Sequence, residues 1–213
     1  AANAVIMDAL RTHYPAIPVI SEENREVLYS ERSGWEEFWL VDPLDGTKEF
    51  VKKNGEFTVN IALVKHGAPV AGVVYRPVDN TLYCAESGSG AFKSSGHASP
   101  EKIFNNCHYL SREEVTVVAS RSHRTQETDD FIEDLRGKGK SVECIATGSS
   151  LKLCLVAEGA ANVYPRFGPT MEWDTGAAQS IVLESGRQVL EYPAGEPLTY
   201  NKPSLKNPWF VVE

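Results

Sequence analysis

Alternating apolar and polar residues in the first part of the chain restrict the folds that it can adopt. Residues 57–92 follow this two-residue period, and it is interrupted at two pairs of turn residues, His66 with Gly67 and Asp79 with Asn80. Strands joined by such short turns run antiparallel. The pattern therefore predicts an antiparallel meander in the first half of the protein.

The pattern changes after this meander to short apolar segments separated by helical spacing. We expect helices over residues 2–12, 125–137, 149–159 and 173–186. The last three of these each end near a glycine. We expect further short strands within residues 17–23, 38–41 and 115–120. An α/β (α+β layered) fold follows, with a meander-rich first part and an alternating second part.

The stretch WLVDPLDGTKEF runs an apolar strand into two aspartates, Asp42 and Asp45. A turn alone would explain these residues, because Asp, Pro and Gly are the commonest turn residues. The alternative is a metal site. Asp42, Asp45 and the backbone carbonyl of Leu44 can present oxygen ligands from one tight turn, and hard cations such as Mg²⁺ prefer oxygen ligands.

Other acidic residues also lie where an element begins or ends. Glu22 and Glu23 close a short strand, and Asp174 precedes a run of small helix formers. A solvated strand end and a helix N-cap are the ordinary explanations, and neither position is diagnostic alone. Repetition of this placement favours a cleft on which the carboxylates converge.

Composition excludes several classes of protein. The chain has 213 residues, 42% hydrophobic content and a formal charge of −8. That charge disfavours a surface that tracks a nucleic-acid polymer, and no apolar run is long enough to form a transmembrane segment. The four cysteines form no C-x-x-C pair, so we expect a soluble protein of the reducing cytoplasm with a small-molecule partner.

Several motifs together resemble a known family. SEE, WLVDPLDGTKEF and WDT-A-Q match, in order and spacing, the metal-binding signatures of the inositol monophosphatase superfamily. NGEFTVNIALV, SSLKLCLVAEG and YPRFGPTMEWDT resemble its bacterial 3'(2'),5'-bisphosphate nucleotidases of the CysQ type. The resemblance implies alternating helix and sheet layers of the inositol monophosphatase/sugar phosphatase type. It also implies a metal-binding α+β sub-domain at 1–110 and an α/β nucleotide-binding sub-domain at 111–213.

The resemblance assigns metal ligands residue by residue. Glu22, Asp42 and the Leu44 carbonyl would hold one Mg²⁺, and Asp42, Asp45 and Asp174 a second. The family implies two or three ions for each site. Such ions neutralise crowded carboxylates and clamp the attacking and leaving oxygens of a phosphoryl transfer. Glu23 lies outside this ligand set.

Catalysis and substrate binding are implied in the same way. Thr47 and Asp45 would be catalytic, with Thr47 orienting a metal-activated water. The substrate-binding residues implied are Glu22, Leu44, Asp45, Gly46, Thr47, His123, Ser149, Lys152, Arg166 and Asp174. Ser149, Lys152 and Arg166 would hold the phosphate and sugar that are not cleaved, and His123 would lie near the base. A helix cap at Ser149, solvated charges at Lys152 and Arg166, and a structural or exposed His123 are the ordinary alternatives.

Two departures from the family pattern qualify these expectations. The chain begins without Met, and we expect the full-length protein to start some tens of residues earlier and to supply a carboxylate partner for Thr47. Gly176 and Ala178 are interchanged relative to the usual W-D-T-A-A-G, which would move a close backbone approach.

The function implied is Mg²⁺-dependent hydrolysis of the 3'-phosphate of adenosine 3',5'-bisphosphate to AMP, with the 5'-phosphosulfate analogue as a second substrate. The alternatives are an inositol monophosphatase and, in another class, a metal- and nucleotide-binding module without turnover. Peripheral contact with the cytoplasmic face of the inner membrane and a monomeric or dimeric state are left open by the sequence.

Overall fold

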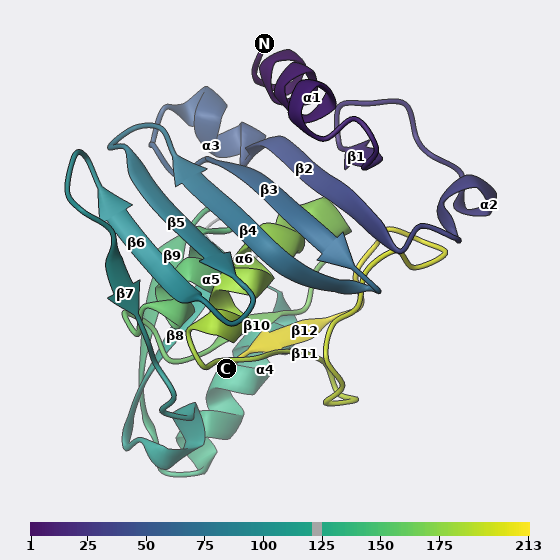
Figure 1. Ribbon diagram of the computed structural model, residues 1–213. Helices are drawn as coiled ribbons and strands as arrows, with labels where there is room; N and C mark the ends of the chain where they lie inside the picture. Colours follow the sequence, from purple (N-terminus) through teal and green to yellow (C-terminus); the bar gives the residue numbers. More distant parts are fainter. Residues whose placement is uncertain (121–124) are drawn as a thin grey trace.

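Sheets and helices alternate in layers in the computed structural model, which describes residues 1–120 and 125–213 (Figure 1). The largest layer is a seven-stranded sheet in which the strands follow each other in chain order. Its strands are β1 (Val19–Ser21), β2 (Glu37–Asp45), β3 (Thr58–Lys65), β4 (Ala68–Arg76), β5 (Thr81–Glu86), β6 (Gly90–Ser95) and β7 (Glu101–Ile103). β1 is parallel to β2 and every other neighbouring pair is antiparallel, so the predicted meander is confirmed.

Two buried helices, α5 (Leu151–Ala157) and α6 (Glu172–Glu184), lie behind the large sheet and form the next layer. α6 packs against β2 to β6 and against α5. The helices α1 (Ala2–His13), α2 (Tyr29–Arg32) and α3 (Thr47–Lys52) belong to the first part of the chain, and α1 packs against β2. The side chains of β2 to β6 that face α6 therefore form the centre of the hydrophobic core with it.

The second half of the chain supplies two smaller sheets. β8 (Glu114–Ser120) pairs in parallel with β9 (Ser141–Thr147), and β12 (Phe210–Val212) lies between β10 (Tyr164–Arg166) and β11 (Val189–Glu191). A parallel bridge between Val117 and Val163 connects the two. α4 (Gln126–Gly137) packs against β9 and β10, and a 3₁₀ turn (Tyr109–Ser111) precedes β8.

Two glycines allow α6 to approach the large sheet closely. A Cβ on Gly72 of β4 would lie 2.3 Å from the Ala177 carbonyl oxygen, a distance that atoms cannot adopt. A Cβ on Gly176 would lie 2.9 Å from Leu40 Cδ2 on β2, whereas Ala178 is accommodated in the core. The interchange of Gly176 and Ala178 thus places the small residue where α6 crosses β2.

The layered α/β fold expected from the sequence is confirmed, and each of its predicted helices is present. The helix expected at 149–159 begins at Leu151 rather than at Ser149, because Ser149 adopts a left-handed φ of 49°. The division into sub-domains at residue 110 stays a prediction. None of the helices in residues 1–120 and 125–213 is long and apolar enough to cross a bilayer.

Candidate active site

A bulge at the end of β2 turns two aspartates toward the same side of the sheet. Asp42 pairs with Asn60 and Asp45 with Thr58, so β2 advances three residues while β3 advances two. Side chains alternate along a regular strand, and residues three apart would face opposite ways. The extra residue corrects this, and Asp45 faces the α6 side together with Asp42. The backbone N–H of Leu44 donates to Asp42 Oδ1 at 2.9 Å and closes the turn.

The third carboxylate comes from the first turn of α6. Asp174 is the third residue of this helix, not its N-cap as the ordinary explanation of the sequence would have it. Its Oδ2 accepts a hydrogen bond of 2.8 Å from the N–H of the N-cap residue, Met171. One ligand oxygen from each of Asp42, Asp45 and Asp174 lies within 4.8 Å of the others. The structure thus brings together three of the four predicted carboxylate ligands.

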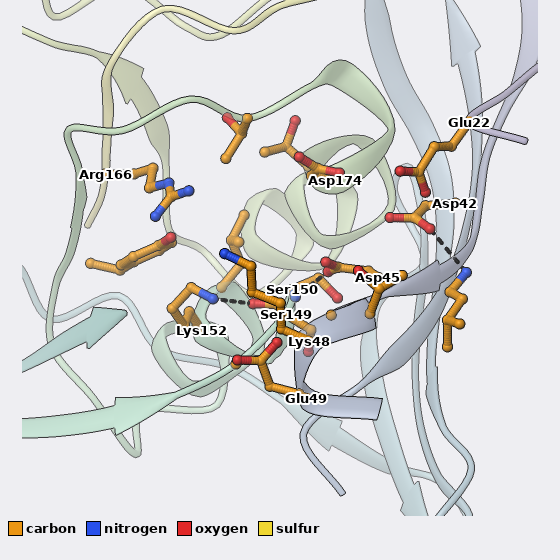
Figure 2. A pocket seen from close by; sticks show the side chains of 18 of the residues that line it. Glu22, Asp42, Asp45, Lys48, Glu49, Ser149, Ser150, Lys152, Arg166 and Asp174 are labelled. Carbon is orange, nitrogen blue, oxygen red and sulfur yellow. Dashed lines mark hydrogen bonds between the residues drawn. The ribbon is translucent and has the colours of Figure 1, made fainter. Parts of the chain in front are cut away.

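Glu22, the fourth predicted carboxylate, follows β1 directly and is exposed at the rim of the same cavity. Its N–H donates to the Val41 carbonyl at 3.1 Å, which fixes its backbone beside β2. Figure 2 shows its side chain next to that of Asp42. We call Glu22, Asp42, Asp45 and Asp174 the acidic wall.

Burial and mutual repulsion change the protonation of the acidic wall. Burial, followed by the charges of Asp45, Glu22 and Asp174, raises the pKa of Asp42 to about 10. Burial and the neighbouring Asp45 raise the pKa of Asp174 to about 7. Burial also raises the pKa of Asp45, although Lys152 opposes the shift. Carboxylates in such a position retain protons unless cations replace them, so the cluster fits hard divalent metal ions.

The opposite side of the cavity carries positive charge. Lys152 of α5 is 7% exposed, and its Nζ donates to the Ser149 carbonyl at 2.5 Å and lies 5.6 Å from the ring centroid of Tyr164. Burial lowers the pKa of Lys152 to about 8. Arg166 of β10 donates from Nη2 to the Pro169 carbonyl at 2.8 Å. We call Lys152 and Arg166 the cationic wall.

The two walls face each other across one cavity of about 240 Å³. Figure 2 places Asp42 and Glu22 on one side and Lys152 and Arg166 on the other, with Asp45 and Asp174 between them. Gly46 and Thr47 line the same cavity where α3 begins. Gly46 has a φ of 85° and is the N-cap of this helix, so glycine is the residue that this turn favours. The cavity therefore has carboxylates that suit a metal ion on one side and positive charges that suit an anion on the other, within one small volume.

The N-cap of α5 was predicted at the wrong serine, and three residues that line the cavity or hydrogen-bond to its carboxylates were not predicted. The N-cap of α5 is Ser150, not Ser149, and the Ser150 N–H donates to Asp45 Oδ2 at 2.6 Å. Ser150 Oγ donates to Asn60 Oδ1 at 2.8 Å, and Asn60 Nδ2 lies 3.4 Å from Asp45 Oδ2. A polar Asn on the buried face of β3 was a signal in the sequence.

Glu49 is the other residue that was missed. Its side chain lines the cavity although it is only 7% exposed. It belongs to the first turn of α3, and no pattern in the sequence indicated that this part of the motif would be buried. His123, expected near the base, lies outside the described residues.

The comparisons with known proteins agree with this geometry. The model of the inositol monophosphatase family matches residues 1–208. The chain belongs to the inositol monophosphatase family. Members of this family are metal-dependent, and Asp42, Asp45 and Asp174 of the acidic wall form a cluster that could hold a metal ion.

Relatives within the inositol monophosphatase family cover the whole chain. The 3'(2'),5'-bisphosphate nucleotidase CysQ of Escherichia coli strain K12 is 46% identical over 213 residues, which are 100% of this chain and 82% of that protein. The crystal structure of CysQ from Bacteroides thetaiotaomicron is 48% identical with a TM-score of 0.89, covering 99% of this chain and 81% of that one. Inositol monophosphatase-II from Staphylococcus aureus is 25% identical with a TM-score of 0.76, covering 99% and 74%.

Proposed function

We propose that this protein is a Mg²⁺-dependent phosphatase that removes the 3'-phosphate of adenosine 3',5'-bisphosphate and releases AMP and phosphate. The observation that carries the proposal is the opposition of the acidic wall and the cationic wall in one cavity. A substrate with one anionic group needs only one of these walls, whereas a bisphosphate uses both. The names of the CysQ relatives support the same activity.

The metal ions would be held by Glu22, Asp42, Asp45, Asp174 and the Leu44 carbonyl. The fit rests on the oxygens of Asp42, Asp45 and Asp174, which lie within 4.8 Å of one another, and on the raised pKa of Asp42 and Asp174. When bound, divalent ions supply Lewis-acid stabilisation of the charge that develops on the reacting phosphate and lower the pKa of water. The charge of the acidic wall would repel an anionic substrate, and bound divalent ions would offset that charge.

The protein's own groups then bind and orient the substrate. The N–H groups of Gly46 and Thr47, at the start of α3, would donate to oxygens of the reacting phosphate, and the Thr47 hydroxyl would orient the attacking water. Lys152 and Arg166 would bind the phosphate that is not cleaved, with Arg166 as a planar fork of donors. The same groups would accept the 5'-phosphosulfate analogue, because its distal group is also an anion.

An inositol monophosphatase is the second candidate, and one observation favours it. The similar Staphylococcus aureus enzyme has been solved both with inositol monophosphate and with 2'AMP, so that enzyme binds an inositol phosphate as well as a nucleotide. The cationic wall distinguishes the candidates, because an inositol monophosphate has no second phosphate to occupy it. A binding module without turnover is the third candidate.

Phosphate release separates the three. We would measure it with adenosine 3',5'-bisphosphate and with inositol monophosphate at matched concentrations, each with Mg²⁺ and with a chelator. We expect kcat/KM to favour the bisphosphate at least about 10-fold, since a charge-assisted contact contributes roughly 1.5–3 kcal/mol. A preference for inositol monophosphate would support the second candidate, and tight binding with no phosphate release would support the third.

The predicted cytoplasmic location, the peripheral membrane contact and the monomeric or dimeric state stay predictions. The carboxylate partner expected for Thr47 stays a prediction as well.

A further inference from the structure

A buried carboxylate outside the cavity lies two residues before Asp174. Glu172 has no exposed surface, and it is absent from the residues that line the cavity. Its Oε2 accepts a hydrogen bond of 2.7 Å from the N–H of Asn201. Its Oε1 accepts from the N–H of Lys202 at 3.0 Å and from Lys202 Nζ at 2.7 Å. Both oxygens are therefore used within the protein, so Glu172 is not a candidate ligand for a metal.

These bonds tie the start of α6 to a distant part of the chain. The partners of Glu172 belong to the segment 199–207, which precedes β12 and which we call the C-terminal strap. The N–H of Glu172 donates to the Leu205 carbonyl at 2.8 Å, so main chain and side chain of one residue both bind the strap. Lys202 also donates to the Thr199 carbonyl at 2.5 Å, which holds the strap in its bent shape.

A second residue of the strap binds the residues on both sides of Glu172. The N–H of Asn207 donates to the Thr170 carbonyl at 2.9 Å, and its Nδ2 donates to the Met171 carbonyl at 2.9 Å and to Thr175 Oγ1 at 3.0 Å. Thr170 and Thr175 line the cavity. Met171 is the N-cap whose N–H binds the Asp174 carboxylate. The strap thus contacts every residue from 170 to 172, and the Asp174 side chain is fixed to the middle one.

We infer that Glu172 is a positioning residue that, through the C-terminal strap, holds Asp174 in the geometry needed to bind a metal ion. The inference rests on the proposed role of Asp174 as a metal ligand. A buried carboxylate must be fully paired, and partial pairing would leave Lys202 or two backbone N–H groups unsatisfied. Removal of groups that hold a metal ligand in its orientation without touching the metal commonly changes metal affinity about 10- to 100-fold.

The test compares two Glu→Gln variants on the same helix. Glu172→Gln replaces one acceptor oxygen with an NH₂ group that faces the Lys202 ammonium or a backbone N–H. Glu184→Gln is the matched control, because Glu184 ends α6 and its carboxylate accepts from two backbone N–H groups, those of Gly88 and Gly90. Mn²⁺ serves as the probe, and its binding is followed by the loss of the free-ion EPR signal during titration of wild-type protein and of each variant.

We expect Glu172→Gln to weaken Mn²⁺ binding about 10-fold and Glu184→Gln to change it by less than about two-fold. Asp174→Asn should weaken the same binding event that Glu172→Gln weakens. The concentration of Mg²⁺ that gives half-maximal activity should rise in Glu172→Gln, and the bisphosphate KM at saturating Mg²⁺ should stay near that of wild type. Unfolding temperatures are measured in parallel to compare the loss of stability in the two Glu→Gln variants.

Different results overturn different statements. Wild-type affinity for Mn²⁺ in a folded Glu172→Gln would show that Glu172 serves stability alone. Failure of wild type to bind Mn²⁺ would overturn the proposed metal site together with this inference. If Glu172→Gln does not fold, Asn207→Ala takes its place, because Asn207 contacts Met171 and Thr170 without a buried charge, and an unchanged Mn²⁺ affinity there would overturn the positioning role of the strap.

Discussion

The acidic wall and the cationic wall differ in how their charged groups are held. Asp42, Asp45 and Asp174 each accept a hydrogen bond from a backbone N–H, so the carboxylates have fixed positions before any ligand arrives. Lys152 donates to the Ser149 carbonyl and Arg166 to the Pro169 carbonyl, and each side chain carries further N–H groups that could donate to a ligand. Under the proposed function, the acidic wall would hold metal ions for the reaction and the cationic wall would bind an anion. Changes in the first should alter kcat, and changes in the second should alter KM.

Asp45→Asn tests the acidic wall and should have the largest effect. The amide keeps an acceptor for the Ser150 N–H but removes a charge, so we expect a folded protein with kcat lower on the order of 10²-fold or more. Asp79→Asn is the control, since Asp79 also occupies a turn between strands and lies outside the cavity. Near-normal turnover of Asp45→Asn at limiting Mg²⁺ would count against the metal site.

Arg166→Ala tests the cationic wall. We expect KM for adenosine 3',5'-bisphosphate to rise about 10-fold, since a charge-assisted contact contributes roughly 1.5–3 kcal/mol, while inositol monophosphate hydrolysis changes little. Arg136→Ala on the exposed face of α4 is the control. Equal losses on both substrates would mean that Arg166 serves the fold or the reaction instead of the distal phosphate.

Asp42→Asn tests whether a carboxylate proposed to bind metal also destabilises the metal-free protein. Burial and neighbouring charges raise the pKa of Asp42 to about 10, so folding near pH 7 without metal requires this carboxyl, which is ionised in the unfolded chain, to take up a proton at a cost in free energy. The amide removes this cost, and we expect metal-free Asp42→Asn to unfold a few degrees above wild type, as about 1 kcal/mol shifts Tm by roughly 2–4 °C at this size. Mg²⁺ should raise the Tm of wild type and leave that of the variant nearly unchanged. A lower metal-free Tm in the variant would contradict the repulsion.

The pH dependence of substrate affinity gives the smallest effect. Burial lowers the pKa of Lys152 to about 8, so its amine is charged below this pH and becomes neutral as the pH rises through it. We expect KM for the bisphosphate to rise about three-fold between pH 7 and pH 9, because the distal phosphate loses a cationic partner. Lys152→Met should show a high KM without this dependence. The same pH dependence with inositol monophosphate would assign the titration to another group.

Features of this protein that depend on neighbouring residues could be predicted from the sequence more fully than features that depend on contacts between distant residues. The meander followed from alternation and turn residues, and Asp42 and Asp45 could be paired because a single turn carries both. The placement of Asp174 at an element boundary favoured its convergence with them, and the family resemblance was needed to assign it as a ligand, since nothing local links residues so far apart. The cap of α5 was expected at Ser149 instead of Ser150, because the left-handed φ that keeps Ser149 out of the helix depends on packing. Glu172 was missed because its partners follow it by about thirty residues in a segment without any recognisable pattern.

The geometry of the site depends on the number of residues in the bulge at the end of β2, and not only on their identity. Asp42 and Asp45 share a side only because one residue of β2 has no partner on β3. Deleting that residue would leave both aspartates in the chain and a regular strand in the sheet, yet it would turn every residue after the deletion to the opposite side. Asp45 would then point away from Asp174, and Gly46 and Thr47 would leave the cavity with it. The length of this turn is therefore as much a part of the proposed metal site as its carboxylates.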